Sequence, residues 1–275
     1  MSTQVDLFTN GEPTSVSPAI AKLPVSRSTF YQGDCLVEMS KIADKSVDMI
    51  LCDLPYGTTA CKWDTIIPFD KLWEQYERII KPNGAIVLFG TEPFSSMLRT
   101  SNIKLYKYDW IWLKTRPSNF FAAKFMPLND KEIISVFSFG GINNGAKNPM
   151  RYYPQGIKSI HRIAKNVNTG GKIGAEHKTS LNDGRLYHQT TTGYPNNLIE
   201  FNNDLNTEHP TQKPISLCEY LIRTYTNEGD TVLDNCMGSG TTGVACKKTG
   251  RNFIGIEKDP KYFEIAVSRV SAYCG

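Results

Sequence analysis

The chain has 275 residues, 40% of them hydrophobic, which is enough for one sizeable α/β domain with an insertion of a few dozen residues. The apolar runs fall far short of the roughly 20 residues that span a bilayer, and no signal-peptide pattern opens the chain, which predicts a cytoplasmic protein. The net charge of +4 identifies no partner by itself, and seven cysteines without C-x-x-C or Cys/His spacing predict neither a metal site nor disulfides.

The first half of the chain alternates apolar strands with helical stretches. Residues 1–25 contain many Pro, Ser and Thr without periodicity, and we expect a flexible tail there. Within residues 26–140 the pattern predicts strands at Thr29–Gln32, Ser46–Cys52, Ala85–Phe89, Lys107–Lys114 and Ile133–Phe139, and helices at Cys35–Ile42, Pro68–Ile80 and Phe94–Ser101. The segment Lys81-Pro-Asn-Gly84 is expected to end the second helix.

Residues 141–206 break this rhythm. They hold eight glycines and many Asn and Thr without a clear period, which predicts an irregular, loop-rich insertion. They also carry eight Lys and Arg residues against four acidic ones, while the segments on either side are neutral. Localised positive charge is typical of a surface that meets a phosphate backbone, although a solvated loop explains the charge equally well.

Regular alternation returns in residues 207–275. The pattern predicts helices at Ile215–Thr226, Thr241–Thr249 and Lys261–Ala272, and strands at Thr231–Asp234 and Phe253–Ile256. Strands separated by helices of this length form a doubly wound, mostly parallel sheet of the Rossmann-like α/β class, in which ligands bind at the carboxyl edge.

A glycine-rich turn connects the strand that ends at Asp234 to the next helix. Gly238, Gly240 and Gly243 satisfy G-x-G-x-x-G, and Glu257 ends the following strand, where a carboxylate can bind ribose hydroxyls. Taken alone, this turn also fits a nicotinamide dehydrogenase. Asp234, however, would repel a pyrophosphate, and only 32 residues follow Gly243, too few for the remaining strands of a dinucleotide fold. The missing strands must therefore precede the turn, so the sheet is circularly permuted.

A second turn, Asp53-Leu-Pro-Tyr56, follows the strand expected to be most buried. An exocyclic base amine is a poor nucleophile because its lone pair is delocalised into the ring. If Asp53 and the Leu54 carbonyl accept its two hydrogens, the lone pair is freed for attack on a methyl group. Pro55 would rigidify the turn and Tyr56 would stack on a base swung out of the duplex. An ordinary turn with a hydrogen-bonded Asp is the alternative.

Together these motifs resemble the permuted-order (beta-type) DNA amino-methyltransferase family, the adenine-N6 and cytosine-N4 methylases. The D-L-P-Y turn is similar to the family's [DNS]-P-P-[YFW] motif, and residues 234–240 to its D-x-F-x-G-S-G motif. His209-Pro-Thr-Gln-Lys-Pro214 matches an H-P-T-Q-K-P element that precedes the cofactor turn in the family. The sequence departs from the family at Leu54, where a main-chain carbonyl carries the role, and at Cys236, where the family has Phe.

The resemblance implies S-adenosyl-L-methionine as the cofactor and specific residues for each role. Thr211 and Lys213 would lie near the methionyl end of the cofactor, Asp34 near its adenine ring, and Glu257 on its ribose. The cofactor set also includes Asp234, Cys236, Gly238 and Gly240. Residues 26–140 would form the catalytic half, 141–206 the target recognition region and 207–275 the cofactor-binding half.

The expected partner is double-stranded DNA, bound through basic residues of the recognition region. The candidates for these contacts are Arg151, Arg162, Lys165 and Arg185. An Asp at the first motif position is more typical of adenine enzymes than of cytosine-N4 enzymes. An RNA methyltransferase, a nicotinamide oxidoreductase and a DNA-binding module without catalysis remain alternatives. A cognate restriction nuclease and a monomer or homodimer are further expectations.

Overall fold

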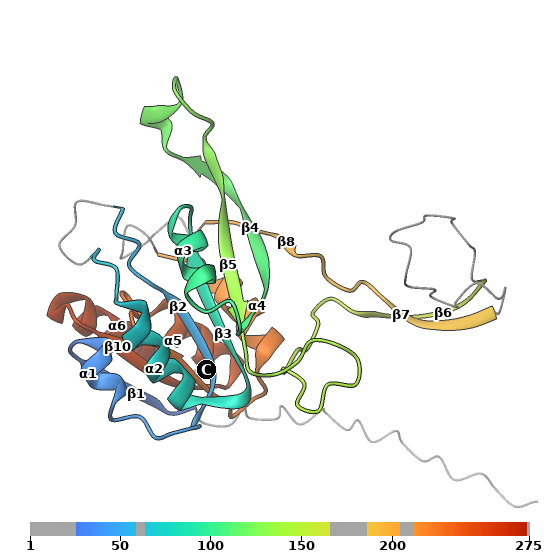
Figure 1. Cartoon of the computed structure of the whole chain (residues 1–275), viewed down its shortest axis with the longest axis horizontal. Coiled ribbons are helices and arrows are strands. Elements are labelled where there is room, and N and C mark those ends of the chain that lie inside the picture. Colours follow the sequence, from blue (N-terminus) through green and yellow to red (C-terminus); the bar gives the residue numbers. More distant parts are fainter. Residues whose placement is uncertain (1–25, 59–63, 166–185, 204–211, 274–275) are drawn as a thin grey trace, which may run out of the picture.

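In the computed structural model the described residues are 26–58, 64–165, 186–203 and 212–273. They form one large sheet with helices on both faces and a separate two-stranded ribbon (Figure 1). The helices are α1 (Cys35–Met39), α2 (Phe69–Ile79), α3 (Phe94–Ser101), η1 (Phe120–Ala122), α4 (Ile215–Tyr225), α5 (Thr241–Thr249) and α6 (Pro260–Ala272). The strands are β1 (Ser28–Gln32), β2 (Val47–Asp53), β3 (Ile80–Gly90), β4 (Tyr106–Ser118), β5 (Asn129–Phe137), β6 (Lys158–Lys165), β7 (Leu186–Thr192), β8 (Leu198–Phe201), β9 (Thr231–Asp234) and β10 (Asn252–Glu257).

The main sheet has the strand order β1-β10-β9-β2-β3-β5-β4-β8. All neighbouring pairs are parallel except β3–β5 and β4–β5, so β5 alone runs against the other seven strands. The late strand β9 pairs directly with the early strand β2, with Met49 opposite Val232 and Ile50 opposite Leu233. This pairing joins the two ends of the chain in one sheet and confirms the permuted, mostly parallel fold.

Alternation along the buried strand β2 divides the core into two layers. Met49 and Leu51 face one side, where α4 and α5 cover the sheet, while Ile50 and Cys52 face the side covered by α1, α2 and α3. Successive side chains of a strand point to opposite faces, so a strand that is apolar at every position must be covered on both sides. The helix–sheet–helix sandwich therefore follows from the composition of its central strands.

The segment 141–206 is more regular than its composition predicts. β8 pairs in parallel with β4 at the edge of the main sheet, and β6 and β7 form an antiparallel ribbon that stands away from it (Figure 1). Four residues that pair with a distant strand leave little periodic signal in the sequence, because long-range pairing decides their conformation. The sequence predicted a loop-rich insertion and did not indicate these three strands within it.

Two elements of the first half extend beyond their expected bounds. β3 begins at Ile80, so Lys81-Pro-Asn-Gly84 belongs to the strand as well as ending α2. β4 continues to Ser118 and forms, with β5, a long hairpin that projects beyond the sheet (Figure 1). Within the described ranges, no helix is long and apolar enough to cross a membrane.

Candidate active site

The site lies where the chain connections of the sheet diverge. From β2 the chain crosses to β3 on one side, and from β9 it crosses to β10 on the other. Ligands of open α/β sheets bind at such a point, outside the carboxyl ends of the strands. A cavity of about 1240 Å³ opens there, and both the D-L-P-Y turn and the glycine turn line it. This volume exceeds the usual range for one small ligand, which leaves space for a cofactor and a base together.

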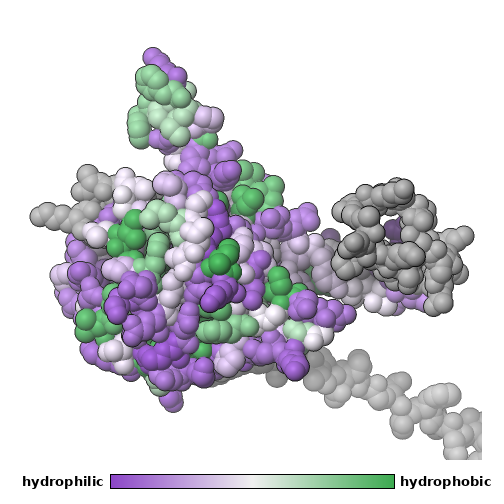
Figure 2. All heavy atoms as spheres, viewed as in Figure 1, coloured by the Kyte–Doolittle hydropathy of each residue, from purple (hydrophilic) through white to green (hydrophobic). Residues whose placement is uncertain are grey.

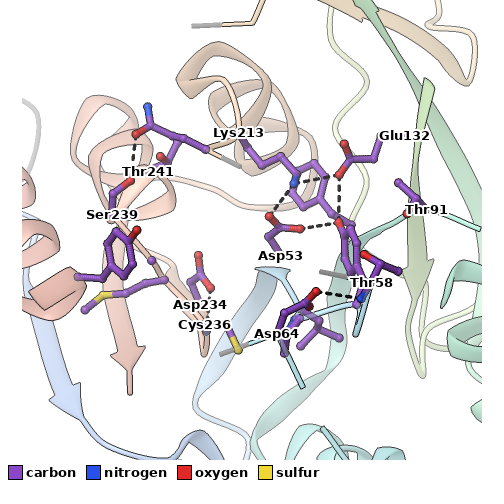
Figure 3. Close-up of a pocket in the computed structure, with 18 of the residues that line it drawn as sticks. Asp53, Thr58, Asp64, Thr91, Glu132, Lys213, Asp234, Cys236, Ser239 and Thr241 are labelled. Carbon is purple, nitrogen blue, oxygen red and sulfur yellow. Dashed lines mark hydrogen bonds and ion pairs between the residues drawn. The ribbon is translucent and has the colours of Figure 1, made fainter. Parts of the chain in front are cut away.

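The catalytic turn expected at Asp53–Tyr56 forms one wall of this cavity (Figure 3). The Tyr56 hydroxyl donates to Asp53 Oδ1 at 2.5 Å and lies 3.0 Å from Glu132 Oε1. One face of the Tyr56 ring packs on Phe94, with the centroids 4.9 Å apart. After the turn, Asp64 accepts hydrogen bonds from the backbone amides of Gly57 and Thr58. The turn is thus held at both ends by carboxylates.

Lys213 connects the catalytic turn to β5. Its Nζ lies 2.6 Å from Asp53 Oδ2 and 2.9 Å from Glu132 Oε1 (Figure 3). Lys114, on β4, pairs with the other oxygen of Glu132 at 3.0 Å. The Lys213 and Glu132 side chains are only 10% and 5% exposed, and charges buried to this degree are stable only when paired and hydrogen-bonded.

Burial and these ion pairs together set the protonation of the network. Burial raises the pKa of Asp53, and Lys213 opposes that rise. Burial also raises the pKa of Glu132, but Lys213 and Lys114 outweigh it, so the net pKa is lowered. The pKa of Lys213 is raised: burial acts against its charge, but its two carboxylate partners outweigh burial. Lys213 therefore stays charged, and Glu132 stays ionised beside it.

The glycine turn forms the opposite wall and approaches its neighbours closely. Gly238 and Gly240 have φ of 51° and 82°, the left-handed region that favours glycine. A Cβ at Gly240 would lie 3.0 Å from Ala266 Cβ, so a side chain there would separate α5 from α6. The Gly238 amide donates to Glu257 Oε2 at 2.9 Å, which places Glu257 beside the turn. Asp34, the N-cap of α1, lines the same cavity.

Asp234 has a different environment from Asp53. It accepts hydrogen bonds from the Thr242 hydroxyl at 2.7 Å and from the Cys236 amide at 3.1 Å, both neutral donors. Burial raises its pKa to about 7, and the hydrogen bond from Thr242 only partly opposes this. Burial likewise raises the pKa of Glu257. Both carboxylates on this wall are therefore suited to a cationic or hydrogen-bond-donating ligand.

Consecutive residues of the H-P-T-Q-K-P element connect the two walls. The Ser239 hydroxyl of the glycine turn donates to Gln212 Oε1 at 3.0 Å, and Arg269 of α6 donates to the same oxygen. Lys213, the next residue, binds Asp53. The ammonium of Lys213 thus pairs with the carboxylate of Asp53, whereas we expected it near the methionyl end of the cofactor.

The expected DNA contacts have different positions. Arg151 lies at the opposite edge of the sheet, where its guanidinium pairs with Asp48 at 2.7 Å and Asp230 at 2.9 Å, so the structure does not bring it to the cavity. Arg162 is exposed on β6, and Lys165 ends that strand. Thr211 and Arg185 lie outside the described residues.

The sequence did not predict two charged residues of the site, Glu132 and Lys114. Both stand at the ends of predicted strands, where a charged residue looks like a solvated strand end. Pairing of β4 with β5 places Glu132 opposite Trp112, close to Lys114, and the cavity encloses both. The cue would have been an acid directly before the apolar run Ile133–Phe137, but only the tertiary pairing gives it a partner.

The fold and the site define an α/β methyltransferase with its two motif turns on adjacent strands. The DNA methylase family model (N6/N4 type) matches residues 47–268, and the chain belongs to this family. This assignment excludes the alternative that the chain is a nicotinamide oxidoreductase. S-adenosylmethionine is the methyl donor, and the residues present fit it, because Asp234, Gly238, Glu257 and Asp34 all line one cavity.

Two relatives cover most of the chain. The Type II methyltransferase M2.DpnII of Streptococcus pneumoniae is 27% identical over 90% of this chain and 91% of its own length. The Type II methyltransferase M2.MboI of Moraxella bovis is 26% identical over 87% of this chain and 86% of its own.

Solved structures show the same fold. The M1.HpyAVI–SAM complex superposes with a TM-score of 0.57 at 25% identity, covering 88% of this chain and 99% of that one. The PvuII DNA methyltransferase, described as cytosine-N4-specific, superposes with a TM-score of 0.61 at 16% identity, covering 90% of this chain and 87% of that one. At that identity the second likeness concerns the fold alone.

Proposed function

We propose that this DNA methyltransferase methylates the N6 amino group of adenine in duplex DNA after the base has been flipped out of the helix. The observation that carries the proposal is the position of Asp53, a partly exposed carboxylate at the cavity wall that is held by Lys213 and Tyr56. An Asp at the first position of the motif is more typical of the adenine enzymes of the family than of the cytosine-N4 enzymes.

Asp53 and the Leu54 carbonyl would accept the two hydrogens of the target amine and direct its lone pair into the cavity. Lys213 favours the ionised form of Asp53, because its ammonium opposes the effect of burial on the pKa of that carboxyl. Tyr56, through its hydroxyl, fixes the other oxygen of Asp53. Pro55 restricts the backbone of the turn, so the acceptors are positioned before the base arrives.

The opposite wall would hold the cofactor. Asp234 would accept from the methionyl amino group, Glu257 would accept from the ribose hydroxyls, and Asp34 would lie near the adenine ring; all three line the cavity. Cys236, Gly238 and Gly240 shape the turn against which the methionyl chain would lie. When bound, S-adenosylmethionine supplies a methyl carbon on a cationic sulfonium, and transfer to the amine leaves a neutral thioether and releases one proton.

The proposal is tested by identifying the methylated product. Purified protein and methyl-labelled S-adenosylmethionine are incubated with unmethylated plasmid DNA, with RNA and with protein, and the DNA is then digested to nucleosides for mass spectrometry. We expect label in DNA alone, as N6-methyladenine. N4-methylcytosine would overturn the adenine assignment, and label confined to RNA or protein would overturn the proposal itself.

The Asp53→Ala variant should transfer no label while it still binds the cofactor. Asp44→Asn serves as the matched control, because Asp44 is an acid on the outer surface whose side chain is 71% exposed. Sequencing the plasmid with a method that reads modified bases gives the recognition site. A cognate nuclease, the oligomeric state and a cytoplasmic location stay predictions.

A further inference from the structure

The tip of the β4–β5 hairpin, residues 115–128, exposes large apolar side chains to solvent. Phe121 and Phe125 are 90% and 89% exposed, Phe120 is 65% exposed and Met126 is 52% exposed. Figure 2 shows an apolar patch near the end of the projecting hairpin. Contiguous exposed apolar groups of this kind indicate a contact surface.

Backbone hydrogen bonds give the tip its shape. Asn119 has a left-handed φ of 72°, η1 follows it, and the amides of Phe125 and Met126 both donate to the Ala122 carbonyl. The tip therefore holds its phenyl rings outward without packing them on one another.

The hairpin leaves the sheet at the edge where the catalytic turn lies. β4 runs parallel to β2 and β3, so its carboxyl-terminal extension projects beyond the same edge as Asp53. Residues 116–121 line the cavity that holds Asp53, so one wall of the cavity continues into the apolar tip. A molecule that places a base in the cavity must therefore pass beside the tip.

Charge favours DNA over a second copy of this chain as the molecule that covers the tip. The segment 115–131 contains three cations, Arg116, Lys124 and Lys131, and one acid, Asp130. Arg116, Lys124 and Lys131 are exposed along the hairpin. Two such cationic tips would repel each other, whereas a phosphate backbone would attract them.

We propose that the hairpin tip inserts Phe121 and Phe125 into the DNA duplex next to the target nucleotide and occupies the stack that the flipped base leaves. This inference rests on the proposed function. Flipping breaks stacking and pairing, and apolar wedges that enter between base steps recover part of that loss. The tip would thus lower the cost of extracting the base without contacting the reacting atoms.

The test compares the double variant Phe121→Ala/Phe125→Ala with the wild type on two substrates. One is a duplex that contains the recognition site mapped on plasmid DNA, and the other is the same duplex with an abasic position opposite the target base. Stacking of an aromatic ring on a base predicts a loss of about ten- to hundredfold in transfer to the intact duplex. On the abasic duplex, where the target is already unpaired, we expect a loss below about threefold.

Phe139→Ala is the matched control, because Phe139 is 44% exposed and lies outside the hairpin tip. It should leave both rates unchanged. A target-position 2-aminopurine, whose fluorescence rises when it is unstacked, should brighten with wild-type protein and not with the double variant.

Each other outcome overturns the inference. Equal losses on the two substrates would indicate a general binding or folding role, and wild-type rates would show that the rings do nothing for DNA. A lower mass in solution for the double variant, with unchanged rates, would assign the tip to a second copy of the chain. A wild-type protein that labels no DNA would refute the proposed function and this inference with it.

Discussion

Two carboxylates end adjacent strands at the site, and their surroundings differ. Asp53, after β2, has a buried ammonium 2.6 Å away, whereas Asp234, after β9, accepts hydrogen bonds from a hydroxyl and a backbone amide. Burial raises the pKa of both. Asp53 thus has a cation built into the fold, while Asp234, which we propose binds the cofactor, has a cation only when a ligand brings one. The charge partner of Asp53 is in place before any ligand binds, whereas the charge partner of Asp234 arrives with the ligand.

The largest expected effects are on different quantities: a change at Asp53 should lower the transfer rate, and a change at Asp234 should weaken cofactor binding. Asp53→Ala removes an acceptor aimed at the reacting amine, so single-turnover transfer should fall by about 100-fold or more with cofactor affinity nearly unchanged. Asp234→Asn removes a charged hydrogen-bond acceptor, so the cofactor Kd should rise by about 10- to 100-fold. Rapid-quench transfer and calorimetric titration measure the two quantities. If both variants changed the same quantity, the division of the cavity would be wrong.

The sequence predicted this difference between Asp53 and Asp234 only in part. Both turns could be predicted because each follows a short apolar strand and carries its own local chemistry, a carboxylate before Pro55 or before the glycines. The parallel sheet and its permutation followed from the spacing of those elements. The cation beside Asp53 could not be assigned, because Lys213 reaches Asp53 across 160 residues of sequence.

The regions that sequence patterns missed depend on tertiary pairing. β8 contributes four residues to the sheet, and only β4 beside it gives them a strand conformation. The hairpin tip contains Pro117 and adjacent phenylalanines without alternation, so no strand period extends into it. Glu132 looked like a solvated strand end until its partners Lys114 and Lys213 were placed.

Removing the ammonium of Lys213 should leave Asp53, like Asp234, without a protein cation beside its carboxylate. Lys213→Met leaves Asp53 and Glu132 without their shared partner, so the pKa of Asp53 should rise further. Transfer at neutral pH should fall by about 10- to 100-fold, and the acidic limb of the pH–rate profile should move to higher pH. Breaking a buried pair also destabilises the fold by about 3–5 kcal/mol, which thermal unfolding measures.

Lys213→Arg is the matched variant, since it keeps the charge. It should restore the position of the acidic limb even where its larger head group slows transfer. A pH profile of Lys213→Met that keeps the wild-type shape would mean that the ammonium holds the turn together without setting the protonation of Asp53.

The Asp234 side should show its dependence on pH in the unliganded protein. The pKa of Asp234 is about 7 in the fold and near 3.8 in the unfolded chain, so folding takes up a proton between these values. The contribution of Asp234 to stability is therefore fully present below about pH 4 and is lost as pH rises through 7. Cofactor affinity should change in the opposite direction, because the ionised carboxylate binds a cationic ligand more strongly.

Denaturant unfolding and cofactor titration across this pH range provide the measurement. In Asp234→Asn both trends should flatten, and the unliganded variant should be more stable than the wild type at pH 8. Affinity that falls as pH rises through 7 would contradict the assignment of Asp234 to the cationic end of the cofactor.

The smallest expected effect concerns the hydroxyl of Tyr56, which connects Asp53 to Glu132. Tyr56→Phe keeps the ring on Phe94 and removes one donor to a carboxylate that Lys213 still holds, so transfer should fall by only about three- to tenfold. Tyr56→Ala also removes the ring expected to stack on the flipped base, and should cost about ten times more. Tyr106→Phe is the matched control, because its hydroxyl donates to Asp109, likewise three residues away, outside the cavity lining. Equal rates for Tyr56→Phe and Tyr56→Ala would show that only the hydroxyl of Tyr56 contributes to transfer. The ring of Tyr56 would then not stack on the flipped base.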